Sequence, residues 1–283
     1  AAHYNMNPKR KKAYSSYLKH IGTFLIFIII FNSCQDEKAE DIEYINKHTK
    51  IIAHRGYWNI KGSTENSISS LTNAQMRGFY GSEFDVFITS DGIPVISHEK
   101  YINKMIIEDT PYKNIKNYIL RNGEILPTLE RYLIVGAKHK ETKLILEIKP
   151  LSTKDKEDDA VKIIRELVGN YNMDEQVNYI SFSLNICTKM RKLNPSAKIF
   201  YTNGDLAPSR VKELGLSGIS YNYSIFNKNI KWIKEAKNLG LMTNVWVVND
   251  VELMKEFLKE EVDFITTDEP VMLTQVIRKN TSK

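Results

Sequence analysis

The stretch EFDVFITSDGIPVISHE, residues 83–99, decides how the chain folds. It contains two apolar runs on either side of the pair Asp91-Gly92. An Asp-Gly pair between alternating apolar residues is the strongest short signal for a β-hairpin. We therefore interpret the second run, residues 94–97, as an antiparallel return arm, which does not count among the parallel strands of the fold.

Eight other short runs have the composition of β-strands, and they lie at residues 51–54, 82–88, 143–149, 177–183, 198–202, 218–224, 243–248 and 263–267. Amphipathic helical patterns separate most of them, at residues 65–78, 126–139, 155–171, 229–240 and 250–261, and several of these patterns end at glycine. Repeated strand–helix units imply a parallel sheet, and eight units imply a closed (β/α)8 barrel of the TIM type. The sequence thus predicts an α/β barrel with a small β-hairpin insertion at its C-terminal rim. An open, doubly wound sheet is the alternative.

The predicted hairpin also brings chemically active residues together. If Asp91 and Gly92 are its two central turn residues, Asp85 lies directly opposite His98, with Cβ atoms about 5 Å apart. Glu83 lies on the same face, because side chains alternate along a strand. Two carboxylates and an imidazole would therefore share one surface at the rim where barrel enzymes place their active sites.

Other strand ends carry residues of the same kind, namely His54, Arg55, Glu147, Lys149 and Trp246. Several buried carboxylates repel one another without a cation, and carboxylate oxygens without cysteine favour one divalent cation, Mg²⁺ or Ca²⁺. Two histidines are suited to acid/base roles near neutral pH, and Arg55 and Lys149 supply the positive charge that a phosphate needs. Together these residues predict cleavage of a phosphodiester.

The motifs, taken in order, resemble the glycerophosphodiester phosphodiesterase family. They are HRG (54–56), STENS (63–67), EFDV (83–86), TSDGIPVISHE (89–99), LEIKP (146–150), NVWVVND (244–250) and VDFITTDEP (262–270). The resemblance extends from Ile51 to about Leu273. It implies a barrel fold and divalent-metal-dependent hydrolysis of glycerophosphodiesters to glycerol phosphate and an alcohol.

Carried over by position, the resemblance implies a role for each residue of the motifs. Glu83, Asp85 and Glu147 would hold the metal, Glu65 would ligate it or orient a neighbour, His54 and His98 would be the acid/base pair, Arg55 and Lys149 would contact the phosphate, and Trp246 would form the apolar wall against the glycerol. Glu99 departs from the family pattern, which usually has aspartate after the second histidine, and this departure leaves the identity of the substrate open.

Two alternatives remain for the function. The first is a lysophospholipid or phosphoinositide substrate on the same type of barrel. The second is a barrel at the cell surface that binds a phosphorylated ligand without catalysis. Binding alone would not require His54 and His98, so these two histidines distinguish the second alternative from an enzyme.

The N-terminal residues have the pattern of an export signal. A basic stretch, Lys9 to Lys12, precedes the uncharged apolar run from Ile21 to Phe31, which is shorter than the roughly 20 residues of a spanning helix. The sequence FNSC that follows resembles a bacterial lipoprotein signal in which Cys34 is lipidated. We predict a leader at 1–34, a polar tether at 35–48 and the barrel at 49–283, exported and anchored to a membrane in the periplasm or at the cell surface. An uncleaved anchor or a buried apolar strand is the alternative.

The bulk composition excludes other classes of protein. The net charge is +6, and much of the excess lies near the two ends of the chain. No stripe of arginine and lysine interleaved with aromatic residues is present in the sequence, so we expect no nucleic-acid partner. With Cys34 outside the expected fold, a structural disulfide to Cys187 is not expected. The sequence does not indicate the oligomeric state.

Overall fold

The computed structural model describes residues 49–281. The predicted leader, the lipidation site at Cys34 and the whole predicted tether lie outside the described residues. Lipid anchoring and export therefore stay predictions, which the mass of the mature protein would test. Among the described residues, no helix is both long enough and apolar enough to cross a membrane.

Eight parallel strands form a closed barrel, in which each strand pairs with its neighbours along the chain. They are β1 (Lys50–Ala53), β2 (Gly81–Ile88), β6 (Lys143–Ile148), β7 (Val177–Ser181), β8 (Lys198–Tyr201), β9 (Gly218–Asn222), β10 (Met242–Trp246) and β11 (Phe264–Thr267). Strand β1 pairs with β11 on one side and with β2 on the other, where Ile52 is the partner of Gly81. This closure confirms the predicted barrel and excludes the open sheet.

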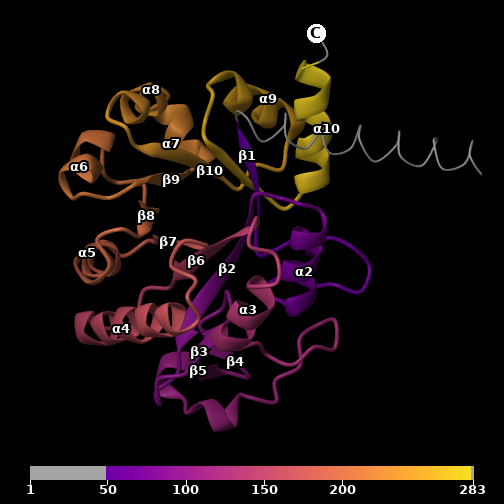
Figure 1. Ribbon diagram of the computed structural model, residues 1–283, viewed down its shortest axis with the longest axis vertical. Helices are drawn as coiled ribbons and strands as arrows, with labels where there is room; N and C mark the ends of the chain where they lie inside the picture. The colour runs from indigo at the N-terminus through magenta and orange to yellow at the C-terminus, as the bar shows by residue number, and fades with distance from the viewer. Residues whose placement is uncertain (1–48, 282–283) are drawn as a thin grey trace, which may run out of the picture. The chain divides into compact units, whose positions relative to one another are not determined.

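Helices follow the strands and surround the barrel (Figure 1). They are α2 (Ile68–Met76), α3 (Leu129–Gly136), α4 (Lys154–Asn170), α5 (Leu184–Leu193), α6 (Pro208–Glu213), α7 (Tyr223–Lys228), α8 (Lys231–Asn238), α9 (Val251–Lys259) and α10 (Pro270–Thr281). Side chains of the residues before several helices accept hydrogen bonds from the first turn, as Thr128, Thr153 and Asp250 do. Such N-caps satisfy amide groups that have no partner inside the helix, and they set where each helix begins.

Side chains alternate between the outside and the inside of the barrel along each strand, and the inward ones form an apolar layer with a polar layer above it. On β6, Leu144 and Leu146 pack in the large core shared with the helices, whereas Ile145 belongs to a smaller cluster with residues of other strands. Glu147 follows Ile145 by two residues and therefore lies on the same face, one level higher. On β2, Glu83 is the Cα partner of Ile145, and Asp85 is the partner of Glu147. The strand register thus brings the carboxylates together above the apolar layer.

The insertion after β2 is larger than the predicted hairpin. It occupies residues 89–128 and contains β3 (Pro94–Ile96), β4 (Tyr101–Ile102), β5 (Met105–Ile106) and two short 3-10 helices, η1 (Ile107–Asp109) and η2 (Tyr112–Asn114). A further antiparallel bridge joins Ile119 to Ile125. The insertion has its own hydrophobic cluster, which includes Phe87 of β2. In Figure 1 it lies at the lower end of the view.

The register predicted for the hairpin is wrong by one residue. Val86 pairs with Ile96, and the backbone amide of Ser97 donates to the carbonyl of Asp85. Asp85 therefore lies opposite Ser97 and not opposite His98. The predicted two-residue turn needs positive φ at both Asp91 and Gly92. Gly92 has a φ of +83°, but the φ of Asp91 is not positive.

Asp91 has another role in this turn, which explains the shift. Its carboxylate accepts hydrogen bonds from the Thr89 hydroxyl at 2.7 Å and from the Tyr112 amide at 2.9 Å. The amide of Thr89 donates to the carbonyl of Ile93, so three residues separate the two ends of the hairpin. The contact with Tyr112, in the distant part of the insertion, helps to fix this longer turn.

Candidate active site

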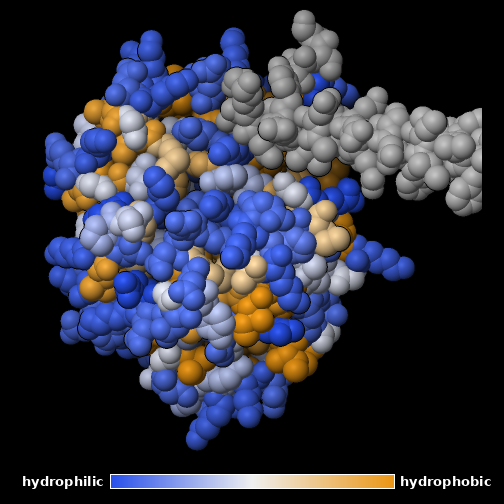
Figure 2. Space-filling view, viewed as in Figure 1, coloured by the Kyte–Doolittle hydropathy of each residue, from blue (hydrophilic) through white to orange (hydrophobic). Residues whose placement is uncertain are grey.

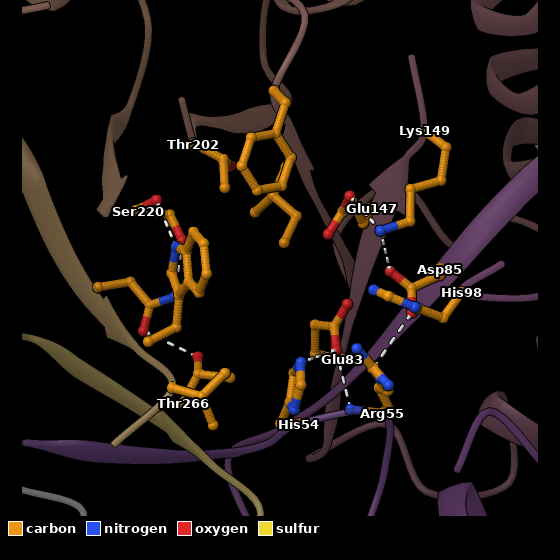
Figure 3. Close-up of a pocket in the computed structure, with 15 residues that line it drawn as sticks. His54, Arg55, Glu83, Asp85, His98, Glu147, Lys149, Thr202, Ser220 and Thr266 are labelled. Atoms are coloured by element: carbon orange, nitrogen blue, oxygen red, sulfur yellow. Dashed lines mark hydrogen bonds and ion pairs between the residues drawn. The ribbon is translucent and has the colours of Figure 1, made fainter. Parts of the chain in front are cut away.

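One pocket of about 130 Å³ opens at the C-terminal ends of the barrel strands. Figure 3 shows its lining, in which His54 lies beside Glu83, and His98 lies beside Asp85. Eight of the residues predicted from the sequence line this pocket: His54, Arg55, Glu83, Asp85, His98, Glu147, Lys149 and Trp246. The fold therefore gathers residues that are up to 192 positions apart (246 − 54) into a single site.

Three buried carboxylates form the centre of the site. Glu83, Asp85 and Glu147 each offer an oxygen, and these oxygens lie within 4.8 Å of one another. The ammonium group of Lys149 lies 2.7 Å from Asp85 Oδ1 and 2.7 Å from Glu147 Oε1. Arg55 Nε lies 3.7 Å from Asp85 Oδ2. Three negative groups thus meet two positive ones in a part of the protein shielded from water.

The electrostatics of this acidic cluster are unfavourable for the fully ionised state. Burial and the negative charges of Asp85 and Glu147 raise the pKa of Glu83 well above its usual value. Burial and Asp85 raise the pKa of Glu147 to about 7. Asp85 behaves differently, because the Lys149 ammonium and hydrogen bonds outweigh burial and lower its pKa. A positive ion next to Glu83 and Glu147 would favour their ionised forms and offset the effects of burial and of the neighbouring carboxylates on both pKa values.

The donor set fits a hard divalent cation. Carboxylate oxygens are the ligands that Mg²⁺ and Ca²⁺ prefer, and the described lining of the pocket contains no cysteine. Glu83, Asp85 and Glu147 are therefore the residues that can hold the ion. Glu65 lies outside this acidic cluster and forms an ion pair with the guanidinium of Arg55. Of the two roles predicted for Glu65, the orientation of a neighbour matches this contact.

The loop after β1 holds two of the three buried carboxylates in place. Arg55 has a positive φ of 53°, and its backbone amide donates to Glu83 Oε2 at 2.8 Å. Asn66, also at positive φ, donates from Nδ2 to Asp85 Oδ2 at 2.8 Å and accepts from the Asp85 amide at 3.1 Å. Strand β1 pairs with β2 only as far as Ser82. Beyond that residue, these hydrogen bonds from the loop after β1 hold the carboxylates of Glu83 and Asp85.

The two histidines differ in their surroundings. His54 is mostly buried, with 18% of its side chain exposed, and its Nδ1 lies 2.8 Å from Asp268 Oδ1. His98 is 38% exposed at the mouth of the pocket, and its Nδ1 lies 3.0 Å from Glu99 Oε1. In both rings a carboxylate contacts Nδ1, which leaves Nε2 for contact with a substrate.

An apolar wall lies across the pocket from the acidic cluster. Trp246 and Phe182 meet edge to face, with ring centroids 5.6 Å apart. The indole Nε1 of Trp246 donates to the backbone carbonyl of Ser220 at 2.7 Å, which fixes the orientation of the ring. In Figure 3, Ser220 and Thr266 lie on the opposite side of the pocket from Asp85 and Lys149.

Comparison with known proteins agrees with this geometry. The model of the glycerophosphoryl diester phosphodiesterase family matches residues 54–272. The chain belongs to this family. Members of this glycerophosphoryl diester phosphodiesterase family are phosphoric diester hydrolases, and so is this protein.

This phosphodiesterase matches nearly the whole length of each of the following three relatives. A solved glycerophosphodiester phosphodiesterase from Parabacteroides distasonis is 40% identical, with a TM-score of 0.82, and the match covers 83% of this chain and 98% of that one. A glycerophosphodiester phosphodiesterase from Caldanaerobacter subterraneus is 28% identical over 246 residues, which is 82% of this chain and 98% of the relative. A phosphodiesterase from Oleispira antarctica, solved in complex with the product sn-glycerol-3-phosphate, has the same fold at 23% identity and a TM-score of 0.73, over 82% of this chain and 97% of that one.

The structure of this phosphodiesterase adds Asp268, to which the sequence analysis gave no role. Its carboxylate accepts from Asn249 Nδ2 at 2.7 Å and from Trp58 Nε1 at 3.3 Å, in addition to its contact with His54. Burial acts to raise the pKa of Asp268, but the hydrogen bond and charge of His54 outweigh it and lower this pKa. An ionised carboxylate only accepts hydrogen bonds, so in its neutral form His54 carries its proton on Nδ1 and its lone pair on Nε2. The signal in the sequence was its place directly after the last strand, in the motif VDFITTDEP.

We expect Asp268→Asn to lower kcat by about 10²-fold with little change in KM, because a displaced or wrongly protonated imidazole loses its reactive geometry. Steady-state kinetics and thermal unfolding of the two proteins check this. Asp159→Asn, on the outer helix α4, is the matched control and should behave as the parent. A rise in KM with unchanged kcat would contradict a role in positioning His54.

Proposed function

We propose that the protein hydrolyses glycerophosphodiesters to glycerol phosphate and an alcohol, with one divalent cation, Mg²⁺ or Ca²⁺, at the acidic cluster. The observation that carries this proposal is the single pocket in which Glu83, Asp85 and Glu147 lie between two histidines and beside an apolar wall. The product bound by the Oleispira relative, sn-glycerol-3-phosphate, supports the same substrate class. When bound, the cation would polarise the phosphoryl oxygens and offset their charge.

In this proposal His54 is the base, because its Nε2 carries a lone pair and its ring is held by Asp268. It accepts the proton of the attacking hydroxyl, which belongs either to water or to the glycerol of the substrate. In the second case a cyclic glycerol phosphate forms first, and water then adds to its phosphorus and opens the ring to glycerol phosphate. The oxygen of that hydroxyl forms a new bond to phosphorus. Trp246 and Phe182 would contact the carbon atoms of the glycerol and exclude water there.

His98 is the acid in this proposal, because it lies at the open side of the pocket. As the bond between phosphorus and the leaving oxygen breaks, His98 gives a proton to that oxygen, and the alcohol departs neutral. The carboxylate of Glu99 contacts Nδ1 and can orient the ring for this step. Arg55 and Lys149 supply positive charge close to the phosphate.

A direct assay tests the proposed activity. The full chain is incubated with glycerophosphocholine and each cation in turn, and glycerol 3-phosphate is measured with a coupled dehydrogenase. We expect release of glycerol 3-phosphate with at least one cation, and none from the His54→Ala protein. Lysophosphatidylcholine and phosphatidylinositol are tested in parallel, since turnover of only one of these would favour the alternative substrates. Binding of the diesters without any turnover would contradict the proposal and favour a ligand-binding barrel.

A further inference from the structure

A second pocket of about 170 Å³ lies next to the first. His98 lines both pockets, and the ion pair between Arg55 of the first and Glu65 of the second also joins them. Three segments build the second pocket: the loop at residues 64–66, the segment at residues 96–102 and a hairpin at residues 118–126. The group assigned to protonate the leaving alcohol thus lies on the boundary between the two pockets.

The hairpin at residues 118–126 is held by backbone hydrogen bonds within it and by the contact of Glu124 with helix α2. The amide of Leu126 donates to the carbonyl of Tyr118 at 2.8 Å, and the amide of Leu120 donates to the carbonyl of Glu124 at 2.7 Å. The carboxylate of Glu124 accepts from the amides of Ile68 and Ser69, at the first turn of helix α2. A negative group at a helix N-terminus is stabilised by the free amides and the helix dipole. The wall of the second pocket is therefore a fixed structure.

The floor and the rim of this pocket differ in chemistry. Ile96, Ile102 and Leu126 are at most 3% exposed and form an apolar floor. The rings of Tyr101 and Tyr118 also line the pocket. Tyr101 is 47% exposed and belongs to the apolar residues of the insertion that reach solvent, with Ile106, Ile119 and Ile125. Figure 2 shows apolar residues in the lower half of the view, where Figure 1 places the insertion.

The charges at the rim balance one another. Two carboxylates line the pocket: Glu65 is paired with Arg55, and Glu99 contacts His98 Nδ1. Arg121 is the remaining charged group, and it has no acidic partner among residues 49–281. When Arg55 of the first pocket is counted, two guanidinium groups match the two carboxylates. A pocket with balanced charge gives no net attraction for a cation or an anion, whereas its carboxylates and guanidinium offer acceptors and donors for hydroxyl groups.

We propose that this second pocket receives the departing alcohol and selects a neutral, polyhydroxylated one, such as glycerol or inositol. The inference rests on the proposed hydrolysis of glycerophosphodiesters. The carbon face of the polyol lies on the tyrosine rings and the apolar floor, while its hydroxyl groups contact Glu99 and Arg121. A cationic alcohol such as choline leaves Arg121 without a hydrogen-bond acceptor and places like charges near one another.

A panel of diesters that differ only in the alcohol tests this selection. The value of kcat/KM is measured for the glycerol, inositol, choline, ethanolamine and methanol diesters of glycerol phosphate. We expect the two polyol diesters to exceed the choline diester by about tenfold or more, as hydrogen bonds to charged groups predict. Methanol has a single carbon and cannot fill the second pocket, so its diester reports on the reaction alone.

Two substitutions at the rim separate selection from catalysis. Arg121→Ala and Tyr101→Ala should each lower kcat/KM for the polyol diesters by about tenfold, and they should leave the methanol diester within about twofold of the parent. Arg131→Ala, an exposed arginine on helix α3 outside the pocket, is the matched control and should change neither. Calorimetric binding of glycerophosphoinositol to the parent and to Arg121→Ala provides a second readout that needs no turnover.

The outcomes distinguish this inference from the proposed function. Turnover of every diester with no effect of Arg121→Ala on the polyols, or a preference of the parent for choline, would overturn the inference and leave the function intact. Equal losses for methanol and polyol diesters would also overturn it, since the substitution would then act on catalysis. If no diester is hydrolysed, the function fails, and equal binding of glycerophosphoinositol by parent and Arg121→Ala would reject the pocket as well.

Discussion

Replacing His98 by alanine should slow hydrolysis of glycerophosphomethanol by about 10²–10⁴-fold, the usual contribution of a positioned acid. The same substitution should leave hydrolysis of the p-nitrophenyl diester of glycerol phosphate almost unchanged. The reason is that p-nitrophenolate is a stable anion and departs without a proton, whereas methoxide does not. Initial rates with the two substrates, measured on parent and variant at one cation concentration, check this.

His139 provides an unusually close control for this experiment. Its side chain is 38% exposed, as that of His98 is, and its Nδ1 lies 3.2 Å from a carboxylate oxygen of Glu141. His139→Ala should therefore retain full activity on both substrates. His54→Ala should lose activity on both, because the nucleophile needs a base whatever the leaving group. Equal losses on both substrates for His98→Ala would show that His98 does not protonate the leaving oxygen.

Removing the divalent cation should abolish turnover. Without it, Glu83 and Glu147 repel each other and Asp85 in a buried site, and the phosphate meets negative charge at the centre of the pocket. Dialysis against EDTA followed by addition of Mg²⁺ or Ca²⁺ should restore activity and identify the ion. Full activity in EDTA would contradict the assignment of the acidic cluster as a metal site.

Glu147→Gln tests the same site without an activity assay. Calorimetric titration should show cation affinity reduced by at least about 10- to 100-fold. Loss of a residue that only orients a metal ligand has an effect of this size, and loss of a ligand itself should have at least the same effect. The cation should also raise the unfolding temperature of the parent but not of the variant, because only binding to the folded state stabilises it. Glu166→Gln, on the exposed side of α4, is the control. Unchanged cation affinity in Glu147→Gln would remove Glu147 from the ligand set.

The strands and most of the pocket were predictable from the sequence because they depend on local patterns. Runs of β-branched and aromatic residues located the N-terminal ends of the eight barrel strands to within one residue and their C-terminal ends to within two. The predicted runs 177–183 and 218–224 both extend two residues beyond β7 and β9, since the chain leaves the sheet there to form the rim. The alternation of side chains then placed Glu83 with Asp85, and Glu147 with Lys149.

Contacts between distant segments were not predictable in this way. The hairpin register depended on the bond from the Tyr112 amide to Asp91, which no rule for a two-residue turn includes. The contact between His54 and Asp268 joins residues that are 214 positions apart. The second pocket arises only when the hairpin at 118–126 meets the loop at 64–66. In each case the decisive partner is set by the tertiary fold.

Strand β2 pairs with three other strands, and these pairings use different parts of its length and different edges. Its first residues pair with β1 and close the barrel, and its last residues pair with β3 and begin the insertion. Its other edge pairs with β6 from Gly81 to Val86. The part of β2 that carries Glu83 and Asp85 is therefore held by β6 on the edge opposite the insertion. Substitutions in residues 89–128 other than His98 can therefore change which headgroup is accepted without replacing a carboxylate of the acidic cluster.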